Sequence, residues 1–161
     1  MSVSDEGRKA AIGDEGGAPL HLSLVTLGVG DLARAVAFYE AMGLERRMRA
    51  AEGVAFYHAG TIALALYPRD ALAADAGVLE GEVAPASFSA IAFACNRPSR
   101  QAVDATIARM VSAGGKVLRP AEATVWGGYC GYVADPDGHM WEIAHNSGFP
   151  LDEQGRVRVP E

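Results

Sequence analysis

The chain carries the same order of apolar segments twice, and this repetition restricts the fold more than any single motif does. Each copy begins with a β-prone segment, continues with an amphipathic helix and ends with three short strands. In the first copy these segments are residues 21–29, 32–42, 44–48, 53–58 and 61–67, followed by a helical turn at 69–74. In the second copy they are residues 88–95, 100–112, 116–119, 128–134 and 139–145. The sequence therefore predicts an α+β fold of two tandem βαβββ modules, with residues 77–86 as a linker.

Residue types at the ends of the first predicted helix support this pattern. Asp31 stands before the helix, where its side-chain oxygen can accept a hydrogen bond from a first-turn amide. Gly43 follows the helix and can adopt the left-handed conformation that ends one. If the helices lie outside the sheets and cover one face of each, the opposite faces line a cleft.

Composition restricts the classes of partner. The chain of 161 residues has a formal net charge of −6 and a sequence pI of about 5.2, so a nucleic-acid partner is not expected. No apolar run approaches the roughly 20 residues of a membrane helix, and residues 1–19 have the composition of a flexible leader rather than a secretory signal. Two cysteines, Cys95 and Cys130, do not make a disulfide framework, which favours a cytoplasmic location.

Three segments resemble one family in order and spacing. Residues 24–45 resemble its opening strand, Asp-capped helix and Phe-Tyr pair, and residues 90–122 resemble the counterpart in the second module. Residues 131–146 contain an Asp-Pro-Asp-Gly turn followed by a strand that bears a glutamate. Together these segments resemble the vicinal-oxygen-chelate superfamily, which includes glyoxalases, bleomycin-resistance proteins and extradiol dioxygenases. The resemblance implies one domain at residues 20–147, with modules at 20–76 and 87–147 and a tail at 148–161. It also implies that the paired modules form an open, barrel-like cavity with the helices outside.

The resemblance also implies four inward positions that hold a divalent metal in the family. In this chain they fall on Leu24, on Leu64 or its neighbour Ala65, on Ala90 and on Glu142. Only Glu142 can bind a metal, whereas a catalytic site needs about three protein ligands. We therefore expect no cofactor, although a divalent metal in an atypical site stays an alternative.

The four histidines do not repair this predicted site. Side chains alternate between the two faces of a strand. His21 is three residues from Leu24, and His139 and His145 are each three residues from Glu142, so all three should point away from these positions. His58 lies near the end of a strand, and its face is not settled by the sequence.

The same alternation predicts the residues that line the cavity. Tyr132, Cys130 and Glu142 should share the inward face, with Trp126 at its mouth. Either Phe56 or Tyr57 should face the cavity, and Phe56 shares the face of His58. The candidate ligand-binding residues are therefore Glu142, Tyr132, Cys130, Trp126, Phe56 and His58. Cys95 should face the helix side.

Three functions fit these residues. The leading one is a homodimeric protein, like the drug-sequestering members of the superfamily, that binds a small organic molecule in an apolar, aromatic cavity without a metal. The second is a lyase, isomerase or dioxygenase with an atypical metal site, or a metal-free enzyme with Glu142 as a catalytic general base. The third is a non-catalytic interaction module. The sequence does not decide whether a reaction is catalysed.

Overall fold

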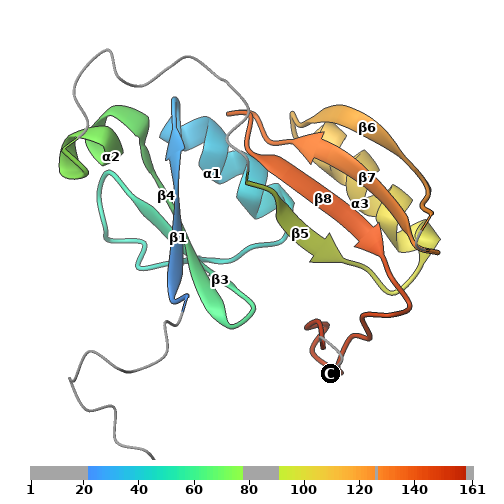
Figure 1. Ribbon diagram of the computed structural model, residues 1–161. Coiled ribbons are helices and arrows are strands. Elements are labelled where there is room, and N and C mark those ends of the chain that lie inside the picture. The colour runs from blue at the N-terminus through green and yellow to red at the C-terminus, as the bar shows by residue number, and fades with distance from the viewer. Residues whose placement is uncertain (1–21, 78–90, 126, 159–161) are drawn as a thin grey trace, which may run out of the picture.

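The computed structural model describes residues 22–77, 91–125 and 127–158, and within them it confirms the predicted α+β fold of two tandem modules (Figure 1). The first module contains β1 (Leu24–Val29), α1 (Leu32–Ala41), β2 (Arg46–Arg47), β3 (Ala55–Ala59), β4 (Ile62–Pro68) and α2 (Arg69–Asp75). The second contains β5 (Phe93–Asn96), α3 (Arg100–Ser112), β6 (Lys116–Ala123), β7 (Tyr129–Ala134) and β8 (Met140–His145). Apart from Gly77, the predicted linker lies outside the described residues. No described helix is long and apolar enough to cross a membrane.

The two modules share one strand order. The first sheet has the order β1-β4-β3-β2 and the second has the order β5-β8-β7-β6. In each sheet the opening strand runs parallel to the closing strand, and the other pairs are antiparallel. Neither sheet closes on itself, so together they form an open, curved architecture rather than a complete barrel.

Local chemistry sets the helix limits as the sequence predicts. Asp31 has extended backbone and accepts a hydrogen bond from the Arg34 amide at 3.0 Å. Gly43 has a φ of 89°, a left-handed conformation that glycine adopts without steric cost. Ser99 caps α3 in the same way, by accepting a bond from the Ala102 amide at 3.1 Å.

Several strands differ in length from the prediction, and β2 and β6 show the two directions of the difference. β2 has only two residues, whereas five were expected at 44–48. β6 continues four residues beyond the expected end at Arg119, because it pairs with β7 through two register shifts. Pro120 lies within it, and a proline is tolerated there because β6 is an edge strand that does not need every N–H in the sheet.

One hydrophobic core joins the modules. Figure 1 shows α1 in the middle of the molecule, with the first sheet on one side and the second sheet on the other. The side chains of Phe38 and Tyr39 on α1 are almost fully buried in the same cluster as Leu66 of β4 and Ile143 of β8. α3 packs against the second sheet, mainly on β7 and β8, so one face of that sheet stays free of helices.

Candidate functional site

The face of the second sheet that points away from α3 brings together three of the predicted residues. Tyr132 on β7 stands opposite Glu142 on β8, and Cys130 stands opposite Ala144. The alternating residue Ile143 belongs to the hydrophobic core, so its neighbour Glu142 points to the open face. Strand alternation therefore places Glu142, Tyr132 and Cys130 on one face, as the sequence predicts.

The electrostatics of this face keep its thiol and phenol protonated. Burial raises the pKa of the Cys130 thiol, and the nearby Glu142 carboxylate raises it further. Burial and the same carboxylate also raise the pKa of Tyr132. As protonated groups, both can donate a hydrogen bond toward the nearby Glu142 carboxylate. A carboxylate offers about four acceptor positions, so Glu142 can accept further hydrogen bonds from a ligand.

A charged pair borders this face on β6. Arg119 stands opposite Tyr132 and Glu122 stands opposite Cys130, and the two side chains form an ion pair with each other. No described Lys, Arg or His forms an ion pair with Glu142. The half-buried Glu142 carboxylate thus lies beside a neutral thiol and a neutral phenol, without a cationic partner among the described residues.

On the first sheet the structure resolves which aromatic side chain faces the core. Tyr57 is almost fully buried in the core, so Phe56 and His58 lie on the opposite, open face. His58 stands opposite Ala63, which in turn stands beside Leu24. Phe56 and Glu142 belong to different sheets, and Trp126 lies outside the described residues, so the predicted set is only partly assembled.

The positions that the resemblance assigns to metal ligands do not fit a metal ion. Leu24 is 42% exposed, whereas Leu64 is 3% exposed and belongs to the core. Leu24 stands beside Ala63 in the sheet, so Leu64 points the opposite way, and placing Leu64 on the inward face is wrong. Ala65, the alternative position, shares the face of Leu24, and Ala90 lies outside the described residues. With aliphatic side chains at the other positions, Glu142 has no partner ligand there. Within the described ranges, no three His, Cys, Asp or Glu side chains gather in a way that could hold a metal.

Two of the other histidines make structural hydrogen bonds away from Glu142. His139 Nδ1 lies 2.8 Å from Asp135 Oδ2, and His145 Nδ1 donates to the Arg97 carbonyl at 3.1 Å. Both therefore point away from Glu142, as strand alternation predicts. His21 lies outside the described residues.

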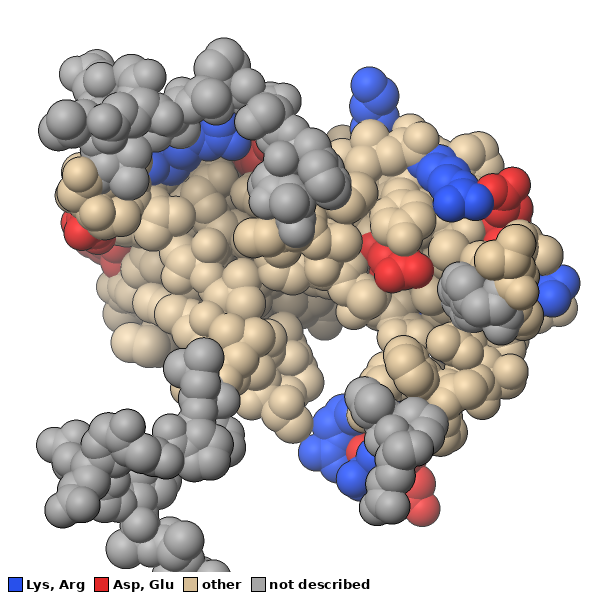
Figure 2. Space-filling view, viewed as in Figure 1, with Lys and Arg blue, Asp and Glu red and all other residues tan. Residues whose placement is uncertain are grey.

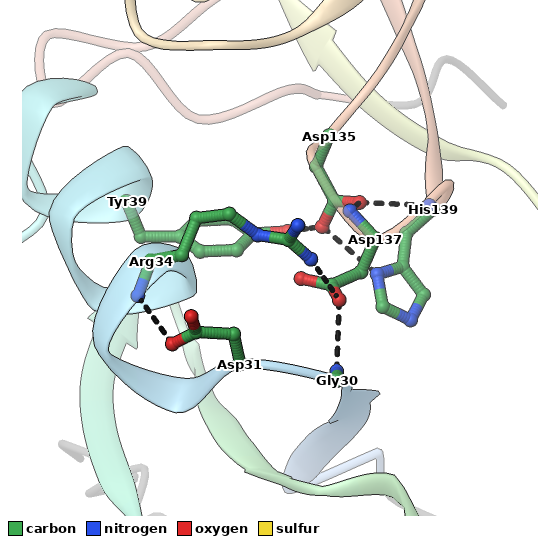
Figure 3. Close-up of polar contacts among 7 residues, drawn as sticks. All are labelled: Gly30, Asp31, Arg34, Tyr39, Asp135, Asp137 and His139. Carbon is green, nitrogen blue, oxygen red and sulfur yellow. Dashed lines mark hydrogen bonds and ion pairs between the residues drawn. The ribbon is translucent and has the colours of Figure 1, made fainter.

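Sequence reasoning missed a buried network that links α1 to the turn between β7 and β8 (Figure 3). The Tyr39 hydroxyl donates to Asp135 Oδ2 at 2.7 Å and accepts a bond from Trp141 Nε1 at 3.3 Å. Asp135 Oδ1 also accepts bonds from the amides of Asp137 and His139, which shapes the Asp-Pro-Asp-Gly turn. Burial raises the pKa of Asp135, but the hydrogen bond and charge of His139 outweigh it and hold that pKa below its usual value.

A second contact of this turn reaches the start of α1. Asp137 Oδ1 accepts bonds from Arg34 Nη2 and from the Gly30 amide, each at 2.8 Å. The turn motif was visible in the sequence, but its partners lie about a hundred residues away, where no local pattern could indicate them. Its aspartates hold the modules together and are not directed at the open face.

A large cavity lies elsewhere, beside the C-terminal tail. Its volume is about 1250 Å³, and it opens between the β3–β4 hairpin, β5 and residues 152–158. We call it the tail cavity. His58 lines it, but Glu142, Tyr132, Cys130 and Phe56 do not. Nothing in the sequence pattern indicated this cavity, because its walls come from several segments far apart along the chain.

Comparison with known proteins gives the family. The model of the Glyoxalase/Bleomycin resistance protein/Dioxygenase superfamily matches residues 21–143, which is most of the chain. The chain belongs to this superfamily. None of the curated proteins matches it.

Solved structures of this superfamily have the same fold. A glyoxalase-related enzyme from Fulvimarina pelagi is 38% identical, with a TM-score of 0.77, and the match covers 88% of this chain and 99% of that one. A glyoxalase/bleomycin resistance protein/dioxygenase family enzyme from Burkholderia phytofirmans PsJN is 16% identical, with a TM-score of 0.69 and coverage of 78% and 98%. A lactoylglutathione lyase from Agrobacterium tumefaciens is 21% identical, with a TM-score of 0.58 and coverage of 80% and 95%.

Proposed function

We propose that this superfamily member binds a small organic molecule on the open face of the second sheet, with Glu142 as its polar anchor and without a catalytic metal. One observation carries the proposal. Glu142 is half-buried beside the protonated Cys130 and Tyr132 and has no cationic partner among the described residues. A carboxylate in this setting favours a ligand that donates hydrogen bonds through an amine or a hydroxyl group.

Apolar surroundings support an organic ligand rather than an ion. Met140 and Ala144 lie on the same strand face as Glu142, and Ala94 stands beside Glu142 on β5. Cys130 and Ala144 are nearly inaccessible to solvent, so the apolar contact is offered by the exposed Ala94 and the half-buried Met140. The face therefore offers apolar contact around one acceptor group, which is the usual composition of a small-molecule site.

We infer that two copies of the chain form a homodimer and that the second copy encloses the ligand. No described helix covers the open face of the second sheet, and β1 and β5 are edge strands with apolar exposed residues at or beside them. Leu24 on β1 is 42% exposed, and Ile91, just before β5, is 59% exposed. Such edges are usually covered in a folded protein. A solution mass of twice the 16.8 kDa of the chain supports this proposal, and a monomer at micromolar concentration contradicts it.

A thermal-shift screen in the presence of a metal chelator tests the binding function. An organic amine or alcohol that binds at 100 times its Kd stabilises the protein by about 2.7 kcal/mol. For a chain of this size, that stabilisation raises Tm by roughly 5 to 10 °C. Glu142→Gln should abolish most of this rise while leaving the Tm of the free protein close to that of the wild type.

Glu52→Gln is the matched control, because Glu52 is an exposed residue in the loop before β3. It should leave the ligand-induced rise intact. A ligand that shifts the wild type and Glu142→Gln equally would remove Glu142 from the site. One tightly bound divalent metal per purified chain would overturn the metal-free proposal.

A further inference from the structure

The tail cavity has features of a binding site that the superfamily membership does not assign. Its volume of about 1250 Å³ accommodates a drug-sized molecule. Figure 2 shows the molecule hollowed between its two halves, with basic side chains gathered at the lower edge of the hollow, over the C-terminal tail. Glu142, Tyr132 and Cys130 do not line this cavity, so the inference does not depend on the function proposed above.

The charge of the cavity is opposite to that of the chain. Its described lining contains the guanidinium groups of Arg47, Arg97, Arg156 and Arg158 against the carboxylates of two acidic residues, Glu45 and Asp152. Four cations against two anions leave two positive charges in excess, whereas the whole chain has a formal net charge of −6. A local basic site on an acidic protein favours an anionic ligand.

Arg97 is fixed in place but lacks a partner for its charge. Its backbone amide donates to the Ala144 carbonyl at 2.7 Å, and its carbonyl accepts a bond from His145. Its half-buried guanidinium forms no ion pair with a described residue, and its Nε is buried without a hydrogen-bond partner among them. A half-buried charge without a partner costs free energy, and a bound anion would supply the missing ion pair and hydrogen bonds.

The tail presents two more arginines on a structured hairpin. Leu151 pairs with Val157, and Asp152 accepts bonds from the amides of Gln154 and Arg156. Asp152 Oδ2 also binds Arg156 Nε at 2.8 Å, whereas Arg158 Nη2 is 3.6 Å away. These backbone and side-chain bonds from Arg156 hold the pKa of Asp152 below its usual value. One carboxylate is thus shared by two cations, which leaves the 69% exposed Arg158 side chain available to a ligand.

Apolar residues form the other part of the wall. Trp141, Leu44 and Ile62 line the cavity together with the arginines. Trp141 is half-buried and offers an aromatic surface. An inorganic ion would leave this surface unused, whereas an organic anion would bury it.

We propose that the tail cavity binds a small organic anion with an aromatic or alkyl body. Its carboxylate, sulfonate or phosphate group lies among Arg97, Arg156 and Arg158, and its apolar body lies against Trp141 and Ile62.

The test uses two fluorescent probes that share one aromatic skeleton. 8-Anilinonaphthalene-1-sulfonate is an organic anion, and N-phenyl-1-naphthylamine is its uncharged counterpart. The full-length protein should bind the anion at least tenfold more tightly at low ionic strength, because charge-assisted bonds to arginine supply the difference. This preference should shrink as salt is added.

Variants then locate the anion. Arg97→Gln and, separately, Arg158→Gln should each weaken binding of the sulfonate by about tenfold, with little effect on the neutral probe. Arg109→Gln removes the same charge from an exposed position on α3 outside the cavity and should change the affinity less than twofold. Arg158 is exposed on the tail, so its variant keeps the test valid even if Arg97→Gln does not fold.

Three results would overturn the proposal. The two probes could bind equally well, which would indicate an apolar patch without charge recognition. The affinity for the sulfonate could be the same in the wild type, Arg97→Gln and Arg158→Gln. Arg109→Gln could weaken binding as much as the cavity variants do, which would indicate a response to net charge alone.

Discussion

At the scale of single residues, two buried tyrosines in one core differ in their hydrogen-bond partners. This difference decides what each hydroxyl group contributes to the free energy of unfolding. The Tyr39 hydroxyl bonds with Asp135 and Trp141, whereas the buried Tyr57 hydroxyl has no partner among the described residues. Burial, and next the charge of Asp135, raise the pKa of Tyr39, so its phenol remains protonated and continues to donate. A buried polar group with partners stabilises the fold, and one without partners costs free energy.

Tyr39→Phe should therefore lower the free energy of unfolding by about 1.5 to 3 kcal/mol, because it removes a hydrogen bond to a buried carboxylate. Tyr57→Phe is the matched control, since it removes a hydroxyl of the same kind that has no described partner. It should be neutral or slightly stabilising. Urea denaturation of both variants measures the difference, and equal losses would contradict this account.

Residue roles were predictable from the sequence where they depend on near neighbours. The predictions were correct for the helix cap at Asp31, the left-handed turn at Gly43 and the strand faces around Glu142, because these are local properties. Of the two positions that the sequence left open, Leu64 lies in the core and Ala65 lies on the face of Leu24, and a one-residue shift in register reverses every side chain of a strand. Nothing local distinguishes Leu64 from Ala65 as the inward residue.

At the scale of elements, the turn between β7 and β8 is organised by one carboxylate. Asp135 accepts bonds from two amides of the turn, from Tyr39 and from the side chain of His139. Its pKa is lower in the folded protein than its ordinary value of 3.8. Ionised Asp135 therefore stabilises the fold above the unfolded pKa, and this stabilisation is lost as the pH falls through the lower folded pKa.

Asp135→Asn should reduce stability most at pH 6 and least near pH 3. At pH 6 the wild type has the full contribution of the carboxylate, whereas near pH 3 protonation removes part of it. The free energy of unfolding of both proteins, measured by denaturant titration between pH 3 and pH 6, gives the difference directly. A difference that does not change over this range would show that the charge of Asp135 does not stabilise the turn.

Element types were predicted better than their limits. α3 was expected at residues 100–112 and spans them, since its cap and apolar periodicity are both local. β6 was expected to end before Pro120, but its place at the edge of the sheet, which is a tertiary property, allows the strand to continue.

At the scale of the whole molecule, the duplication in the sequence predicts two modules but not how they pack. The structure joins them through α1, whose buried side chains belong to the same core cluster as those of β8. Tyr39 and Arg34 on this helix also bond with the turn of the second module. The tail cavity was unpredictable for the same reason, because contacts between distant segments leave no periodic pattern in the sequence.

This shared core predicts that the modules unfold together. In native-state hydrogen exchange, the slowest amides of β4 and those of β8 should have equal free energies of opening, because neither sheet keeps its core when the other unfolds. Asp137→Ala removes the acceptor for Arg34 and Gly30, so it should lower both free energies by the same amount, on the order of 1 to 3 kcal/mol. A decrease confined to β8 would mean that the modules are separate folding units that only touch, and the buried network around Tyr39 would then be a contact between two domains.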